Sequence, residues 1–129
     1  MHEQIKVSVP AEPGFVALLR SVVAGVAGLR GFGVDAIEDL RLAIGEACAD
    51  LLEQAPEGTV LGVDLEVAEG ALEAVVWTDA GAAGWSGAEA EGRLTWLLLR
   101  ALTDEATLIE RPEGPGVRLV KRTAARGAG

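Results

Sequence analysis

Acidic side chains recur at helical spacing between residues 39 and 53, and they are the clearest candidates for chemistry in this chain. Asp39, Glu46, Asp50 and Glu53 project within about 60° of one another on a helix that turns by about 100° per residue. Glu46 and Asp50 lie one turn apart, and such a like-charge pair costs a helix roughly a few tenths of a kcal/mol. The stripe is typical either of a metal or partner site or of an ordinary solvated helix face.

The turn Asp79-Ala-Gly81 is a second candidate. It follows a stretch of alternating apolar residues, and its glycine permits the tight backbone turn that a ligand-binding loop needs. The same three residues also occur at ordinary strand ends. Spacing alone therefore leaves a binding turn and a structural turn both open.

The remaining reactive residue types indicate structural roles. Cys48 is the only cysteine, so the chain forms no internal disulfide, and we expect a buried thiol. His2 has no second metal ligand nearby. We expect Trp77 and Trp96 in the core, and Trp85, within a glycine-rich stretch, at the surface as an interface anchor.

Length and composition predict one globular domain. The chain has 129 residues, and 50% of them are hydrophobic, which excludes an intrinsically disordered protein. We place the domain at residues 1–123 and expect 124–129 to be a disordered tail. No uncharged apolar run reaches the roughly 18 residues of a membrane span, and the acidic start is unlike a signal peptide. We therefore expect a cytoplasmic protein with no membrane partner.

The charge balance bears on the choice of partner. The chain has 11 basic and 20 acidic residues, for a net charge of −9. Nucleic-acid binding needs a dense cationic surface, so this balance argues against nucleic acid. It favours basic protein partners or ligands that carry Mg²⁺.

Hydrophobic periodicity predicts the elements that position these residues. The expected strands are 5–9, 59–67, 72–79, 107–110 and 117–122, and the expected helices are 13–26, 34–52 and 93–102. Their order predicts an α+β fold, a two-layer sandwich with a mostly antiparallel sheet and helices on one face. The helix at 93–102 is apolar on nearly all sides, so we expect it to be well buried. The basic strand at 117–122 is expected at a sheet edge, kept soluble by its charge.

One long segment resembles a known motif. It is similar to the N-box helix of the GHKL (histidine-kinase-like) ATPases and reads Asp39-Leu-Arg-Leu-Ala-Ile-Gly-Glu-Ala-Cys-Ala-Asp50-Leu-Leu. The fold that this resemblance implies is the family's Bergerat-type α/β sandwich. The likeness is to RsbW-type anti-sigma factors, which are small bacterial serine/threonine protein kinases. It extends over Pro10-Ala-Glu-Pro13, Asp79-Ala-Gly81, Leu99-Arg-Ala-Leu-Thr-Asp104-Glu and Gly116-Val-Arg-Leu-Val-Lys-Arg122.

The resemblance assigns roles to the two N-box carboxylates. In the family a glutamate is the proposed general base, and an asparagine four residues later holds Mg²⁺ between nucleotide phosphates. Glu46 matches the glutamate and would be the catalytic residue if this chain is an active kinase. Asp50 replaces the asparagine. It could ligand Mg²⁺ as a hard oxygen donor, but it adds negative charge beside a triphosphate.

The family's two glycine boxes are incomplete here. Asp79 and Gly81 match the first box, whose aspartate accepts a hydrogen bond from the adenine amino group. The second box should bring bare backbone N–H groups to the phosphates, but its glycine positions hold Arg93 and Thr95, with Gly92 just outside. Arg93 could itself reach a phosphate. The resemblance thus implies a degenerate site where ATP and Mg²⁺ bind weakly or not at all.

The family's partners are proteins. Its members bind an RNA polymerase sigma factor through the first helix and nearby loops, an anti-anti-sigma protein competes for part of that surface, and members are typically homodimers. Arg20 falls where that helix can carry a contacting arginine; a purely structural role, in which its aliphatic stem covers the surface, is also open. Asp39, on the acidic helix, and Trp85 are the other predicted partner contacts.

Two functions stay open on the sequence. The favoured one is an anti-sigma factor that sequesters an alternative sigma factor without help from nucleotide. The alternative is an active ATP-dependent kinase that phosphorylates a serine of an anti-anti-sigma partner. A third possibility is that the vacated pocket takes another small ligand, which nothing in the sequence identifies.

Overall fold

The computed structural model describes residues 3–81 and 94–123. Its strands are β1 (Glu3–Pro10), β2 (Val60–Ala68), β3 (Ala71–Thr78), β4 (Glu105–Arg111) and β5 (Gly114–Arg122). Its helices are the 3₁₀ turn η1 (Pro13–Phe15) and the α-helices α1 (Val16–Leu29), α2 (Val34–Leu52) and α4 (Leu94–Leu102). Every element expected from the periodicity is present, with its ends moved by a few residues.

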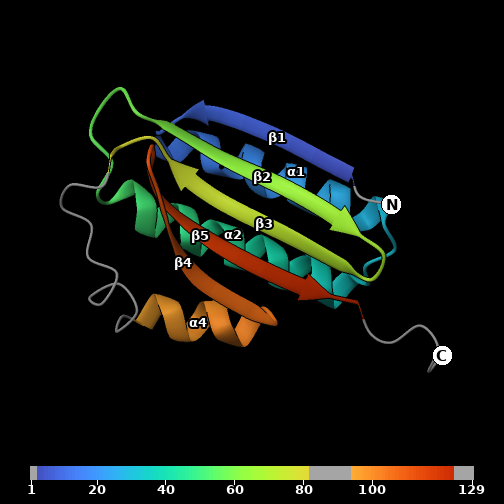
Figure 1. Cartoon of the computed structure of the whole chain (residues 1–129). Helices are drawn as coiled ribbons and strands as arrows, with labels where there is room; N and C mark the ends of the chain where they lie inside the picture. Colours follow the sequence, from blue (N-terminus) through green and yellow to red (C-terminus); the bar gives the residue numbers. More distant parts are fainter. Residues whose placement is uncertain (1–2, 82–93, 124–129) are drawn as a thin grey trace.

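The five strands form one antiparallel sheet in the order β1-β2-β3-β5-β4, and the helices cover one of its faces (Figure 1). The α+β sandwich is therefore confirmed. The expected edge position of the basic strand is wrong, because β5 lies between β3 and β4. The basic side chains of β5 can lie on this interior strand because acidic side chains from neighbouring elements form ion pairs with them.

The helix α2 is central to the helical layer because it packs against α1, α4 and the strands β3 and β5. Its helical pattern supplies a broad apolar face that contains several small side chains. The buried residues of α2 are Leu40, Ala43, Ile44, Ala47, Cys48, Asp50 and Leu51. Burial of one leucine side chain of this kind contributes about 1.5–3 kcal/mol, so this face supplies much of the fold's stability.

The helix α4 is less buried than its composition suggests. Trp96 is fully buried as expected, and Leu99 is 1% exposed, but Leu94, Leu97 and Leu98 are exposed. The expectation of an all-round buried helix is wrong because α4 packs against α2 and β4 with one side alone. Despite the apolar character of α1 and α4, no helix in the described ranges combines the length and hydropathy that a membrane crossing requires.

Trp77 lies on the sheet face that carries no helix, so its predicted core position is wrong. Strand alternation turns the even residues of β3 toward the helices and Trp77 away from them. The indole lies against Gly62, where an added Cβ would be 2.2 Å from the ring. Its Nε1 donates to Asp64 Oδ1 at 3.0 Å, and the Arg111 guanidinium carbon is 4.8 Å from the ring centroid. These contacts tie β2, β3 and β4 together.

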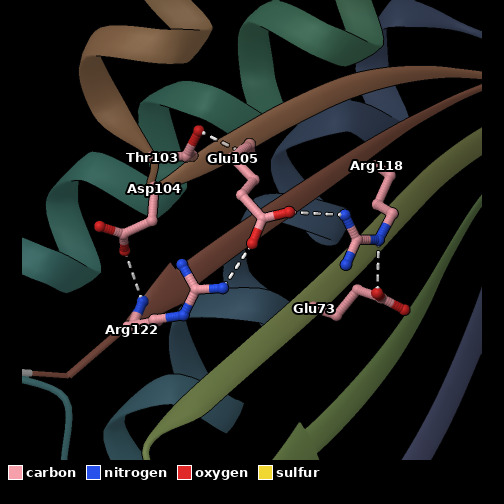
Figure 2. Close-up of polar contacts among 6 residues, drawn as sticks. All are labelled: Glu73, Thr103, Asp104, Glu105, Arg118 and Arg122. Carbon is pink, nitrogen blue, oxygen red and sulfur yellow. Dashed lines mark hydrogen bonds and ion pairs between the residues drawn. The ribbon is translucent and has the colours of Figure 1, made fainter.

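A chain of ion pairs crosses the same open face (Figure 2). Arg118 Nε donates to Glu73 Oε2 at 2.6 Å, and Arg118 Nη1 donates to Glu105 Oε1 at 3.0 Å. Arg122 completes the chain by a hydrogen bond to Glu105. Hydrogen bonds from Arg122 and then Arg118 hold the pKa of the Glu105 carboxyl below its ordinary value. The network places charge on a surface that is exposed to water and joins β3, β5 and β4.

We predict that Gly62→Ala lowers the free energy of unfolding by about 1–3 kcal/mol, because the new methyl group overlaps the Trp77 ring. The matched control is Gly25→Ala in α1, where an added Cβ meets no atom within 4 Å. That change should raise stability by roughly 0.5–1 kcal/mol through the better helix propensity of alanine. Urea denaturation of both variants measures the difference, and equal stabilities would contradict the packing described for Trp77.

Candidate functional site

Three segments that carry predicted site residues meet at one end of the molecule. The C-terminal end of α2, the end of β3 and the beginning of α4 all lie at the left of Figure 1. Glu46 and Asp50 come from α2, and Asp79 and Gly81 follow β3. The C-terminal part of α2 and the turn after β3, which are far apart in sequence, thus lie at the same end of the molecule.

The acidic residues of α2 differ in their exposure to solvent, so the stripe is not one solvated face. Asp50 is 6% exposed because it lies on the buried side of the helix, near Leu51. It is not a free carboxylate in this structure. Glu46, one turn earlier, is half-buried, and Glu53 is exposed. A buried carboxylate needs polar contacts, so the position of Asp50 marks this part of α2 as more than a solvated surface.

Asp39 lies toward the other end of α2 and takes part in an internal contact. Lys121 Nζ donates to Asp39 Oδ2 at 3.1 Å and to the backbone oxygen of Leu102 at 2.8 Å. This lysine therefore links β5 to α2 and to the last turn of α4. A structural role accounts for Asp39, and its predicted role as a partner contact stays a prediction.

The turn after β3 is held from two sides. The backbone nitrogen of Val60 donates to Asp79 Oδ1 at 2.7 Å, so one carboxylate oxygen of Asp79 is used inside the protein. Gly81 has a φ of 79°, and its nitrogen donates to the backbone oxygen of Glu113 at 2.9 Å. Gly114 has a φ of 155° and packs so closely that an added Cβ would lie 2.4 Å from the backbone oxygen of Thr78. The β4–β5 hairpin therefore supports the Asp79-Ala-Gly81 turn.

Thr78 is a residue that the sequence analysis missed. It is 1% exposed, and its hydroxyl has no hydrogen-bond partner among the residues that the structure describes. A buried hydroxyl without a partner is costly, so such groups often mark a place where another molecule or a water binds. The signal was present in the strand pattern, since Thr78 occupies the buried phase of β3 after Leu72, Ala74 and Val76.

Arg20 lies between the two long helices. An added Cβ at Gly45 of α2 would be 3.4 Å from Arg20 Cδ, so the glycine makes room for the arginine stem. Arg20 Nε is buried and has no hydrogen-bond partner within the described part of the chain. The side chain as a whole is half-buried. Packing accounts for the stem, and the outer part of the guanidinium stays the predicted partner contact.

Cys48 is a structural thiol. Burial raises the pKa of Cys48 to about 12, and the nearby positive charge of Arg20 offsets only part of that effect. A thiol with so high a pKa holds almost no thiolate near neutral pH, which excludes it as a nucleophile. This confirms the expectation of a buried small residue.

At this end of the molecule the described residues offer the carboxylates of Glu46, Asp50 and Asp79 together with the hydroxyl of Thr78. A phosphate beside the Asp50 carboxylate would need a cation to offset the repulsion between the two negative charges. Within residues 3–81 and 94–123, no group of three or more acidic, histidine or cysteine side chains is arranged to hold a metal ion. The predicted contacts Gly92, Arg93 and Trp85 lie outside the described residues, as does the tail at 124–129.

Comparison with known proteins agrees with the fold. The model of the histidine kinase-like ATPase domain matches residues 9–121. The chain belongs to the histidine kinase-like ATPase domain family. Its sequence similarity to curated proteins points to the RsbW type within that family.

Three RsbW relatives illustrate the extent of that similarity. The serine-protein kinase RsbW of Halalkalibacterium halodurans is 38% identical over 80 residues, which are 61% of this chain and 49% of that protein. The proteins of the same name from Bacillus thuringiensis strain Al Hakam and Bacillus cereus strain B4264 are each 43% identical over 53 residues, 41% of this chain and 33% of theirs. The chain thus spans less than half the length of these relatives.

We predict that Gly114→Ala disturbs the Asp79-Ala-Gly81 turn, because the new Cβ would overlap the backbone oxygen of Thr78. The expected loss of unfolding free energy is about 2–4 kcal/mol, the sum of backbone strain and steric overlap. The control is Gly58→Ala, where φ is also positive but no atom lies within 4 Å, and we expect a loss of about 1–2 kcal/mol. NMR shifts at Asp79 should move in the Gly114 variant alone. Unmoved shifts there would contradict the support described for this turn.

We also predict that Cys48 resists thiol reagents in the folded protein at pH 9 and reacts quickly after unfolding in urea. Its pKa of about 12 in the folded state lies above the ordinary value near 8.5. The folded state therefore loses stability as the pH rises from about 8.5 through 12, where the unfolded chain releases the thiol proton first. Labelling with a chromogenic disulfide measures both states. Rapid labelling of the folded protein would contradict the burial.

Proposed function

We propose that this chain is an anti-sigma factor of the RsbW type, which binds and sequesters an alternative sigma factor of RNA polymerase in the cytoplasm. Nucleotide binding is weak or lost, and an anti-anti-sigma protein or another signal releases the sigma factor. Residues 1–123 form the binding domain, which acts as a homodimer. The relatives named serine-protein kinase RsbW support the family assignment on which the proposal depends.

The observation that carries the proposal is the outer surface of α1. Over the 14 residues of this helix Arg20 is the one charged side chain. Leu18 is 49% exposed, Leu29 is 77% exposed, and Phe15 at the start of the helix is 37% exposed. The intervening exposed positions are small or uncharged. An exposed apolar helix surface of this kind is typical of a protein-binding face.

The acidic character of the site supports a binding role over a kinase role. Phosphoryl transfer requires phosphates and a metal ion to be positioned in an environment of positive charge. Asp50 places a negative charge where the family carries a neutral asparagine, and the second glycine box holds Arg93 and Thr95. These features favour an interaction that does not need ATP.

The direct test is binding of the full chain to a panel of purified alternative sigma factors from the same organism. We expect one of them to bind at nanomolar to micromolar concentration, with an affinity that Mg-ATP leaves unchanged. Leu18→Ser should weaken that binding by roughly tenfold or more, because it removes a central apolar contact. The matched control is Leu97→Ser on α4, which changes a leucine that is even more exposed, at 66% against 49% for Leu18, and should leave the affinity unchanged. Absence of binding to every sigma factor would contradict the proposal.

Calorimetry with Mg-ATP separates the kinase alternative from the binding protein. The proposal predicts no detectable heat for the native chain and none for Glu46→Ala. A clear binding isotherm in the native chain, together with phosphorylation of an anti-anti-sigma protein that Glu46→Ala abolishes, would establish the kinase instead.

A further inference from the structure

A cavity of about 810 Å³ opens beside the start of α1, on the β1 side of the sheet. Its walls are residues 8–12, where β1 ends and the chain enters η1, and residues 57–60, where the chain enters β2. These residues are separate from Glu46, Asp50 and Thr78. The cavity lies at the same end of the sheet as the candidate site, since β1 ends and β2 begins there (Figure 1).

The walls of the cavity are fixed by backbone hydrogen bonds. The nitrogen of Ala11 donates to the oxygen of Thr59 at 2.9 Å, which joins the two walls just beyond the last pair of the β1–β2 ladder. Residues 56–59 form a tight turn in which Gly58 has a φ of 84°. Thr59 closes that turn by donating from its nitrogen and its hydroxyl to the oxygen of Pro56, at 3.3 and 2.8 Å. The cavity is therefore preformed.

The lining combines two carboxylates with an apolar wall. Glu12 and Glu57 are both exposed, and neither forms an ion pair with any residue that the structure describes. Glu12 occupies the N-cap position of η1 but makes no capping hydrogen bond, so its carboxylate is not used by the fold. Val9, Pro10 and Val60 supply the apolar wall.

We propose that this cavity receives an arginine or lysine side chain from the protein partner that binds α1. The inference rests on the proposed function, because η1 connects Glu12 directly to the exposed Phe15 and Leu18 of the partner surface. The apolar wall suits the aliphatic stem of a basic side chain, and the two carboxylates suit its charged end. The net charge of −9 adds long-range attraction for such a side chain.

A metal ion is a poorer occupant of this cavity. Two carboxylates are fewer than the six or more oxygen ligands that Ca²⁺ takes, and the described residues contain no group of three or more candidate metal ligands. A second copy of the chain is also disfavoured, since it is acidic itself. A single basic side chain matches the two carboxylates and the apolar wall together.

The first test needs no sigma factor and uses the ¹⁵N-labelled full chain. Titration with N-acetyl-arginine amide should move the NMR signals of residues 8–12 and 57–60 in a weak, saturable manner. The neutral analogue, N-acetyl-citrulline amide, should leave them unmoved. The double variant Glu12→Gln/Glu57→Gln should lose the response. The control variant Glu69→Gln/Glu110→Gln, which removes two exposed carboxylates elsewhere, should retain it.

The second test uses the sigma factor that binds the native chain. Glu12→Gln/Glu57→Gln should weaken that binding by about tenfold and reduce its dependence on salt, while Glu69→Gln/Glu110→Gln changes neither by more than about twofold. If the sigma factor binds the cavity variant as tightly as the native chain, the inference is overturned and the proposed function stands.

Three further outcomes would overturn the inference without affecting the proposed function. The arginine and citrulline probes could move the same signals equally, the response could lie away from residues 8–12 and 57–60, or these signals could move when the protein alone is concentrated. The last result would identify a second copy as the occupant. If no sigma factor binds at all, the proposed function fails, and the arginine titration still decides whether the cavity recognises a basic side chain.

Discussion

The structure depends on the close packing of α2 between α1, α4 and the sheet. Such packing needs small side chains at the contacts, and Ala43, Gly45 and Ala47 supply them. Because α2 is held from three directions, its C-terminal part is fixed relative to the end of β3 and the beginning of α4. The same packing buries Asp50 and admits the stem of Arg20. The candidate site is therefore a consequence of how α2 fits into the helical layer.

The two faces of the sheet are covered in different ways. The open face of the sheet is covered by charge, through the ion pairs of Arg118 and the contacts of Trp77. The helical face is covered by α1 and α4, and both present apolar side chains to solvent. Their surroundings differ, since the start of α1 adjoins a preformed cavity with two carboxylates. This combination of apolar helix and acidic cavity is the physical basis for the proposal that α1 carries the partner surface.

The fold could be predicted from sequence because the hydrophobic periodicity of its strands and helices is clear. Alternation in β2 and β3 and helical spacing in α2 predicted the elements, their order predicted the two-layer arrangement, and the N-box likeness implied the same fold. Burial was harder to predict, since it depends on which face of a strand or helix packs against the rest of the protein. Trp77 falls on the odd phase of β3 and so faces away from the helices, and Asp50 falls on the packed side of α2. Gly114 could not be identified, because its importance arises from its close contact with the end of β3. The buried position of Thr78 was readable from the alternation of β3, but its unpaired hydroxyl was not.

The central claim is that this member of the histidine kinase-like ATPase domain family uses its first helix for a protein partner and does not depend on nucleotide. Hydrogen–deuterium exchange of the full chain, measured alone, with Mg-ATP and with the bound sigma factor, tests this most directly. The account predicts that the sigma factor slows exchange over residues 9–29 and that Mg-ATP changes no segment. Slowed exchange at 46–52 and 78–81 with Mg-ATP, and none at 9–29 with the sigma factor, would contradict it.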